Sequence, residues 1–491
     1  MLCATLVCAA LAAAPLDSAL TAVASLPGEP SLVSAAGLVD DRPVLTIENR
    51  SAFERDASAL RVVVVGTDDA SADAAVAAVR WLKTSAPQAI RERWVASALP
   101  LAQFAASDKQ SLARWMTFQV PDLVVEIGPG GAVQLADVRV ERIPAADAVP
   151  ALEKLLASGG SRSALHTEIT ARVGRSPLDI ARLLAGRYPE TPSISYIPAV
   201  SWVNTLRLAA ATGDASLRDR VMGHVRPWLA DGRPLFGDRI QLTSVAGTMV
   251  FADLSADPAA RSLAEEGARR AAEEKSPGVA QYGGGWTDDM FMATVVLART
   301  GKWDGRAGDF DTAARLLTAY AGRLQRADGL FNHAIDGPAA WGRGNGFAAM
   351  GLTEALTAMP LGHPQRDAIL AIYRRQMTAV AAQQAPDGMW REVIDEPGAY
   401  REETATAMLL TAMARGVRLG WIDRSYQANV DRAWRGLAAH VRGDGTIVDV
   451  CASTGGGPTR KYYLERPAIT GADDRGGAMA LLAAMEMRSE R

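Results

Sequence analysis

The chain is short of the residues that usually bind transition metals. Its 491 residues include three cysteines and five histidines. Cys3 and Cys8 lie in the first apolar stretch and Cys451 stands alone, so neither a disulfide framework nor a cysteine zinc site can be assembled. No two histidines have the spacing of a metal-binding pair. The sequence therefore predicts no metal centre.

Strong charge of one sign and long apolar runs are also missing. The net charge is −3 at pH 7, which argues against a surface for nucleic acid or another polyanion. No run after the N-terminus approaches the ~20 apolar residues that span a bilayer. The N-terminus itself, Met1–Ala14, is apolar and uncharged, like the centre of a secretory signal that lacks its basic flank. We expect residues 1–25 to be a signal segment and the protein to be periplasmic or extracellular; the alternative is a loose apolar tail.

Residues 42–158 alternate between strand-like and helix-like runs. The run LRVVVVG at 60–66 is rich in β-branched residues and ends in glycine, which is typical of a buried strand. The alternation predicts a small α/β domain with a parallel sheet. The segment VVGTDDAS after this strand lacks the glycines of a phosphate-binding loop, so we expect the domain to be structural or positional. The other predicted elements are strands at 94–99 and 121–127 and helices at 70–83 and 150–158.

The sequence pattern changes at about residue 176, where a series of predicted amphipathic helices begins. An Asp-Gly pair recurs at Asp328-Gly329, Asp387-Gly388 and Asp444-Gly445, at offsets of 59 and 57 residues. Such a period fits one helical hairpin and its loop, and the pattern over 176–491 predicts an (α/α)6 barrel of six inner and six outer helices. The twelve predicted helices are 176–189, 199–213, 217–229, 242–254, 258–274, 287–301, 309–326, 344–359, 363–384, 403–419, 425–441 and 475–489.

Two carboxylates open one of these helices. Asp288 and Asp289 follow three glycines and Trp286. An aspartate at the beginning of a helix has an ordinary role, because it accepts hydrogen bonds from the free N–H groups there. Two of them beside a tryptophan are more than a cap needs, which makes this segment a candidate catalytic centre.

A second cluster follows in the loop that contains His333, Trp341 and Arg343. A Trp-x-Arg pair offers an apolar face for a sugar ring and a fork for a carboxylate. The alternative is a loop with a surface arginine, a buried tryptophan and a structural histidine. Further on, Glu403 opens a predicted helix, and the tyrosines after Lys461 either line a site or close the fold.

Together these segments resemble glycoside hydrolase family 105, the unsaturated rhamnogalacturonyl hydrolases, and the related family 88 of unsaturated glucuronyl hydrolases. The resemblance covers residues 176–491 in order. It rests on WTDDMFMATVVLART, DGLFNHAIDGPAAWGRGNGF, DGMWREVID, ETATAMLLTAMARGVRLGWID, DGTIVDVCASTGGG and KYYLERP. The resemblance implies an (α/α)6 barrel, in agreement with the helix pattern, and a reaction that needs no metal or organic cofactor.

The implied reaction is hydration of the C4=C5 bond of a terminal unsaturated uronic acid left by a polysaccharide lyase. The resemblance assigns the general acid/base role to Asp288 and an assisting, substrate-holding role to Asp238. It places Trp286, His333, Trp341 and Arg343 against the sugar, and either Gln281 or Tyr282 where relatives often have a histidine.

The expected substrate is unsaturated galacturonyl-rhamnose from pectin, with an unsaturated glucuronyl compound as the runner-up. Two other functions stay open. One is an inverting hydrolase that pairs Asp288 with a second acid such as Glu403, and the other is a sugar-binding barrel without catalysis.

Overall fold

The computed structural model describes residues 16–39, 41–49, 53, 59–100, 109–131, 133 and 135–488. The chain divides into two compact units. The first comprises 1–174 with the short segments 385–387 and 396–400, and the second comprises the rest of 175–491. Most of the predicted signal segment, residues 1–15, lies outside the described residues. Among the helices that are described, none combines the length and apolar character that crossing a membrane requires.

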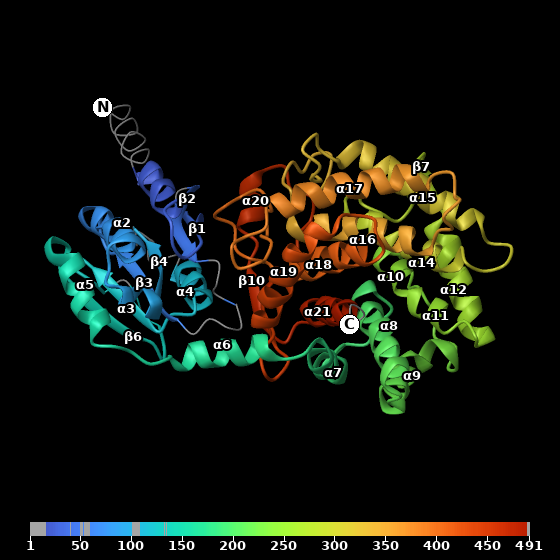
Figure 1. The fold of residues 1–491 in the computed structure, drawn as a ribbon. Coiled ribbons are helices and arrows are strands. Elements are labelled where there is room, and N and C mark those ends of the chain that lie inside the picture. Colours follow the sequence, from blue (N-terminus) through green and yellow to red (C-terminus); the bar gives the residue numbers. More distant parts are fainter. Residues whose placement is uncertain are drawn as a thin grey trace. The chain divides into compact units, whose positions relative to one another are not determined.

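The first unit is built on a six-stranded sheet in the order β1-β2-β4-β3-β5-β6 (Figure 1). Strands β3 to β6 are parallel, as predicted. The sheet is nevertheless mixed, because β2 is antiparallel to both β1 and β4. Strands β1 and β2 follow each other almost directly, and so short a connection permits only an antiparallel pair. The strands are β1 Ser31–Val39, β2 Arg42–Asn49, β3 Leu60–Gly66, β4 Trp94–Leu99, β5 Leu123–Ile127 and β6 Arg139–Ile143.

Two apolar clusters cover the two faces of this sheet, because successive side chains of a strand point to opposite sides. Val62 and Val64 belong to one cluster, and Val63 and Val65 belong to the other. Leu20 and Val23, which lie within the predicted signal segment, are fully buried in the first cluster. The helices of this unit are α2 Asp69–Thr84, α3 Gln88–Arg93, α4 Lys109–Phe118, α5 Ala148–Ala157 and α6 Ala164–Gly174, with a 3-10 turn at Ala145–Asp147.

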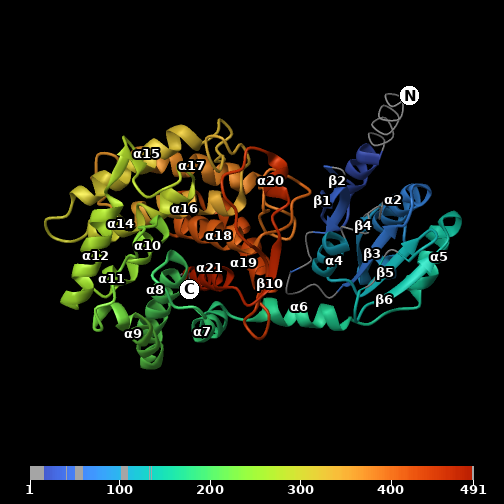
Figure 2. The same ribbon diagram turned by 180° about the vertical axis from the view of Figure 1, so that it is seen from behind.

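The second unit is the predicted (α/α)6 barrel, shown from opposite sides in Figures 1 and 2. Each of the twelve predicted helices has a counterpart in the described residues, and two of them are broken in the middle. The breaks fall at Thr248 and Thr294, whose hydroxyls donate to the carbonyls of Val245 and Met290, a bond that bends helices.

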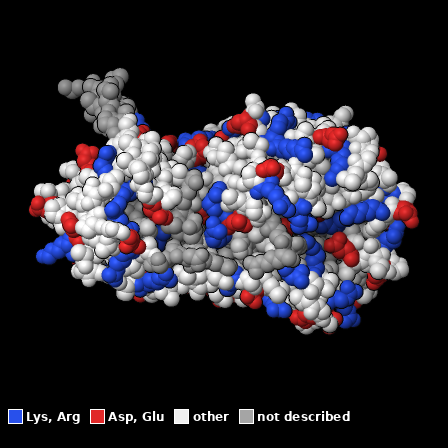
Figure 3. Space-filling model, in the orientation of Figure 1, with Lys and Arg blue, Asp and Glu red and all other residues white. Residues whose placement is uncertain are grey.

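These helices form two concentric layers. The inner ring runs through α8, α10–α11, α13–α14, α16, α18 and α21, and α21 closes it by packing on α8. Inner helices are buried nearly all round, for example from 403 to 416 in α18. The outer helices α7, α9, α12, α15, α17 and α19 bury a single stripe, such as Ala260, Ala264 and Ala268 in α12. On the face seen in Figure 3, basic and acidic side chains are intermixed.

Inner and outer helices alternate along the chain, so all inner helices point the same way. The end at which they begin is called the start end below, and the opposite end is the far end. The barrel helices are α7 Pro177–Arg187, α8 Tyr196–Thr212, α9 Ala215–Leu229, α10 Leu242–Gly247, α11 Met249–Asp253, α12 Pro258–Ala271, α13 Asp288–Met292, α14 Val295–Thr300, α15 Gly308–Leu324, α16 Gly342–Ala358, α17 Arg366–Ala382, α18 Glu403–Arg418, α19 Gln427–His440 and α21 Asp474–Arg488.

Short elements lie in the loops between these helices. The three Asp-Gly repeats are tight turns, in which Gly329, Gly388 and Gly445 have φ of 98°, 89° and 82°, values that favour glycine. Strands β7 and β8 and strands β9 and β10 form two small antiparallel pairs. The bounds are β7 Glu274–Ser276, β8 Val279–Ala280, 3-10 turn Arg424–Tyr426, β9 Ile447–Cys451, α20 Arg460–Leu464 and β10 Ala468–Gly471.

Candidate active site

A chain of three hydrogen-bonded side chains begins at Asp288, the first residue of α13 at the start end. Asp288 Oδ2 lies 3.0 Å from His333 Nε2, and His333 Nδ1 lies 2.9 Å from the hydroxyl of Tyr463. The amide of Gly457 donates to that hydroxyl oxygen, so its proton is available to Nδ1. A neutral His333 then carries its proton on Nε2 and donates it to Asp288. Asp288 is 17% exposed and His333 is fully buried.

The neighbouring Asp289 points back into the glycine run that precedes it. Its carboxylate accepts hydrogen bonds from the backbone N–H groups of Gly284, Gly285 and Trp286 and from the hydroxyl of Tyr320, at 2.7 to 3.3 Å. A side chain on Gly283 would collide with this carboxylate, which explains a glycine there. Burial raises the pKa of Asp289, and the charge of Asp288 adds to the effect. Asp289 therefore anchors the loop that presents Trp286 and Asp288.

The aromatic residues around His333 have different exposures. Trp286 is half-buried, with its ring centroid 5.4 Å from that of His333. Trp341 is only 2% exposed and lies 4.6 Å from His333 on another side. Its Nε1 donates to Glu392 Oε1 at 3.0 Å. The exposed aromatic face beside Asp288 is therefore that of Trp286, and Trp341 is the buried tryptophan of the alternative interpretation, packed beneath His333.

Arg343 lies in the first turn of α16 and is buried, at 3% exposure, contrary to the surface arginine of that alternative. Its guanidinium carbon lies 5.0 Å from the centroid of the Trp341 ring, and one N–H donates to the carbonyl of Cys451 at 2.9 Å. Its Nε has no hydrogen-bond partner. Arg343 is thus a preformed cation at the start end with donor capacity to spare.

Three buried glutamates surround this arginine. Glu402 caps α18 and accepts from the amides of Ala405 and Cys451 at 2.6 and 2.9 Å. Burial and then the charge of Glu402 raise the pKa of Glu392 to about 8. The same two causes hold the pKa of Glu403 well above its ordinary value, and neither of its carboxyl oxygens has a partner. At neutral pH this cluster therefore holds protons on acids that are normally ionised.

Tyr196 and Asp473 complete the start end, and the sequence analysis missed both. Tyr196 opens α8 and is buried, which raises its pKa to about 12; the charges of Arg343 and Asp288 also act on it. Asp473 precedes α21, acts electrostatically on Glu403, and pairs with Arg475 at 2.7 Å. One signal could have found them, because both lie at the beginning of an inner helix, as Asp288, Arg343 and Glu403 do.

Comparison with known proteins assigns the barrel to a family. The sequence profile of Glycosyl Hydrolase Family 88 matches residues 181–490, which is more than half of the chain. The chain belongs to glycosyl hydrolase family 88. The resemblance to the related families 105 and 88 that the motifs indicated is thereby confirmed, as is the (α/α)6 fold.

Individual relatives match only part of this chain, at low sequence identity. An unsaturated rhamnogalacturonyl hydrolase, YesR, from Bacillus subtilis is 27% identical over 190 residues, which is 37% of this chain and 54% of that protein. An unsaturated 3S-rhamnoglycuronyl hydrolase from Alteromonas is 26% identical over 175 residues, 33% of this chain and 42% of that protein. The chain thus spans about half the length of the curated relatives it matches.

Solved structures show the same fold. A family 105 glycoside hydrolase from C. acetobutylicum superposes with a TM-score of 0.58 at 19% identity, over 64% of this chain and all of that chain. A possible family 105 member from Salmonella enterica gives a TM-score of 0.57 at 20% identity, over 64% of this chain and 94% of that chain.

Two residues predicted for the family 88 site lie apart from the Asp288 chain of hydrogen bonds. Asp238 is exposed in the loop between α9 and α10, and no hydrogen bond or ion pair of its side chain occurs among the described residues. Tyr282 follows β8, and its hydroxyl donates to Glu273, beyond the end of α12. The structure brings together Trp286, Asp288, His333, Trp341 and Arg343, which come from two loops and the first turns of two inner helices.

Proposed function

We propose that the protein hydrolyses lyase-generated oligosaccharides by removing their terminal 4,5-unsaturated uronic acid. The observation that carries this proposal is the hydrogen-bonded series Asp288–His333–Tyr463 at the start end, next to the buried cation Arg343. The activities for which the two relatives are named, unsaturated rhamnogalacturonyl and 3S-rhamnoglycuronyl hydrolase, support the class of substrate. Unsaturated galacturonyl-rhamnose is the proposed substrate, and an unsaturated glucuronyl compound is the alternative within the class.

In the proposed mechanism, Asp288 donates a proton to C4 of the enol ether while positive charge develops at C5 and the ring oxygen. The resulting carboxylate then accepts a proton from a water molecule that adds to C5. The product is a hemiketal, which opens and releases the sugar that was linked at C1. Oδ2 of Asp288 is engaged by His333, so Oδ1 is the oxygen that carries the transferred proton. One carboxyl group suffices, provided that it can donate and then accept a proton.

The chemistry of the substrate fits the neighbours of Asp288. The uronic acid carries a carboxylate at C5, and Arg343 supplies a cation with unused N–H capacity to bind it. Trp286 offers a half-exposed ring on which the apolar face of the sugar can stack. His333 keeps the carboxyl of Asp288 oriented, because both of its ring nitrogens are engaged.

The experiment follows the ultraviolet absorbance of the C4=C5 bond in rhamnogalacturonan that a lyase has cut. Wild type should abolish the absorbance, and Asp288→Asn should lower kcat by about 10³-fold, within the range that general acid/base groups contribute. Full activity in Asp288→Asn would refute its role. Release of sugar from saturated oligosaccharides without any change in absorbance would favour the inverting hydrolase. Products of glucuronan-type lyases, tested in parallel, distinguish the two proposed substrates.

Asp238→Asn tests the other predicted catalytic aspartate. If Asp238 holds substrate hydroxyls, its substitution raises KM more than it lowers kcat. A loss of kcat equal to that in Asp288→Asn would instead assign both aspartates to the chemical step. Asp231→Asn is the matched control, because Asp231 is an exposed residue of the same interhelical loop that pairs with Arg226 alone.

A further inference from the structure

The far end of the barrel contains a second ring of polar side chains. On four inner helices, a residue of this ring follows a start-end residue at the same interval. Arg207, Arg299, Glu354 and Glu486 each lie eleven residues after a start-end residue: Tyr196, Asp288, Arg343 and Arg475, respectively. Eleven residues make slightly more than three complete helical turns, so both members of a pair face nearly the same way. At 1.5 Å per residue the two rings are ~16 Å apart.

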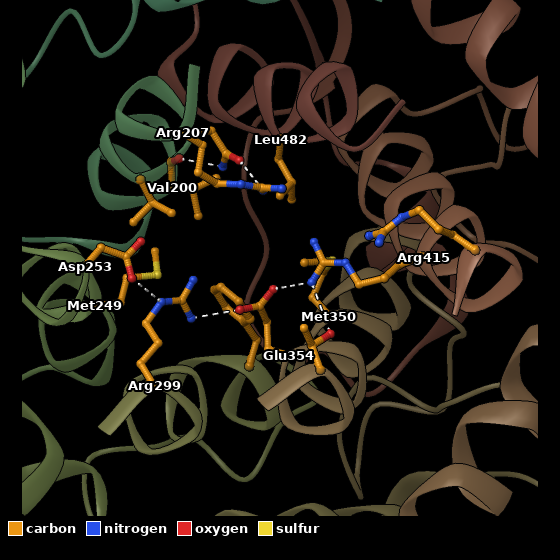
Figure 4. A pocket seen from close by; sticks show the side chains of 14 residues that line it. Val200, Arg207, Met249, Asp253, Arg299, Met350, Glu354, Arg415 and Leu482 are labelled. Carbon is orange, nitrogen blue, oxygen red and sulfur yellow. Dashed lines mark hydrogen bonds and ion pairs between the residues drawn. The ribbon is translucent and has the colours of Figure 1, made fainter. Parts of the chain in front are cut away.

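The second ring encloses a cavity of about 250 Å³ inside the barrel, to which all six inner helices contribute (Figure 4). Apolar walls come from Met249, Phe291 and Met350. The charged side chains that line the cavity are four guanidinium groups, Arg207, Arg299, Arg415 and Arg418, and two carboxylates, Asp253 and Glu354. A pocket of this size lies below the range of drug-sized ligands and would hold only a small one.

Most of these charges are paired. Glu354 bridges Arg299 and Arg415, with 2.8 Å to each. Arg415 also contacts Glu486 at 2.6 Å, and Glu486 in turn binds Arg418. Arg299 reaches Asp253 at 3.3 Å. Three carboxylates thus form ion pairs with three of the four guanidinium groups.

Arg207 is the guanidinium that is left over. Its one hydrogen bond goes to the side-chain oxygen of Asn204 at 2.9 Å, and it forms no ion pair within the described barrel. Burial and then the positive charge of Arg415 lower the pKa of Arg207, and the charges of Glu486 and Glu354 oppose this effect only in part. Figure 4 shows Arg207 on the side of the cavity opposite Arg299 and Glu354.

The helix dipoles at the carbonyl ends of the inner helices do not stabilise the positive charge of Arg207. Cations are stabilised by the helix dipole only within the last turn. Arg418 ends α18 and satisfies that condition, whereas Arg207 lies five residues before Thr212, the last residue of α8. Arg207 therefore lines the cavity as a cation that has no directly paired carboxylate among the described residues.

We propose that this far-end cavity binds one small oxyanion, a carboxylate, sulfate or phosphate group, on Arg207. The guanidinium fork matches the paired oxygens of such groups and binds them more strongly than a neutral acceptor. The apolar walls accept whatever short carbon skeleton the oxyanion carries. This site is separate from the proposed active site and does not depend on the proposed function.

Binding is measured by isothermal titration calorimetry on the full chain, in a chloride-poor buffer, with phosphate, sulfate and glucuronate as probes. At least one probe should bind, and Arg207→Gln should weaken its affinity by tenfold or more, since the amide keeps a hydrogen bond but loses the charge. Arg226→Gln is the matched control, because Arg226 is an exposed arginine of α9. The probe that binds most tightly shows whether the site prefers an inorganic anion or an organic acid.

A crystal soaked in selenate locates the anion by its anomalous signal. A peak within hydrogen-bond distance of Arg207 is expected, and it should vanish in Arg207→Gln. The proposal is overturned if no probe binds, if Arg207→Gln binds as wild type does, or if selenate occupies only the start end or the outer surface. An unfolded Arg207→Gln variant leaves the selenate position in wild type as the deciding result.

Discussion

The two ends of the barrel use the same six inner helices, yet buried glutamates at the start end and Glu354 at the far end have pKa values shifted in opposite directions. At the start end, the pKa of Glu392 is raised to about 8 and that of Glu403 is raised well above its usual range. At the far end, the pKa of Glu354 is lowered to about 2, because Arg299 and Arg415 outweigh the effect of burial. The difference lies in the ratio of acids to guanidinium groups. Burial therefore does not decide the charge of a carboxyl group; the available partners do.

This difference suits two different roles. An end with more acids than cations holds protons at neutral pH, which is useful next to a residue that must give one away. An end with more cations than acids lowers the pKa of Glu354 and Glu486, although burial raises that of Asp253, and it has positive charge left for an anion.

The largest effect is expected at the far end, from Glu354→Gln. The substitution leaves Arg299 and Arg415 buried without the carboxylate that bridges them. Breaking a buried ion pair from one side costs about 3–5 kcal/mol of unfolding free energy. Urea denaturation at pH 7, followed by far-UV circular dichroism, measures the loss. Asp231→Asn, which breaks an exposed pair with Arg226, should change stability by less than about 1 kcal/mol.

The pH dependence of the same variant gives a second measurement. The folded pKa of Glu354, about 2, lies below the ordinary value of 4.5. The stabilisation by its ionised form is therefore complete above pH 4.5 and is lost as the pH falls from 4.5 towards 2, at up to about 1.4 kcal/mol per pH unit. Glu354→Gln should lack this part of the acid dependence. If the unfolding free energy of wild type and variant changed with pH in the same way, the lowered pKa of Glu354 would be contradicted.

Glu392→Gln at the start end should have the opposite sign. Folded Glu392 keeps its proton up to about pH 8, whereas the unfolded chain releases it above 4.5. Wild-type stability should therefore fall as the pH rises from 4.5 to 8, by up to about 1.4 kcal/mol per unit, and the variant should escape that loss. The glutamine oxygen still accepts from Trp341. Above pH 8 the variant should be the more stable protein, and equal stability there would show that the fold does not raise the pKa of Glu392. Glu465→Gln, an exposed glutamate, is the control.

The contrast between the ends also explains what could be predicted from the sequence. Periodicity found all twelve barrel helices, because apolar stripes are a local property. Asp288 and Arg343 could be found because they lie in recognisable segments. The pairing of Glu354 with Arg299 and Arg415 could not, since the three residues come from different helices that only the closed ring brings together. For the same reason Tyr196, on α8, went unnoticed.

Local pattern alone does not decide the role of Trp341, for a physical reason. A tryptophan beside an arginine in a glycine-rich loop can stack on a sugar or be buried, and the residue types are the same in both cases. Only burial distinguishes them: Trp341 is 2% exposed and its indole nitrogen is bound to Glu392. The predicted α/β domain begins at residue 42, so it excludes β1, and the strands predicted within it do not include β2.

The smallest effect is expected from Tyr320→Phe, which removes one of four donors from Asp289. Burial and then Asp289 raise the pKa of Tyr320, so the hydroxyl stays protonated and donates. Loss of one hydrogen bond to a buried acceptor costs about 1 kcal/mol, and the three backbone donors still hold the loop. If Asp289 positions Asp288, kcat on the unsaturated substrate should fall about fivefold with little change in KM, because the shift affects the proton-transferring group rather than Arg343. A rise in KM at constant kcat would show instead that the loop of Trp286 serves binding alone. Tyr426→Phe, which alters an exposed tyrosine bound to Thr378, should leave both constants unchanged.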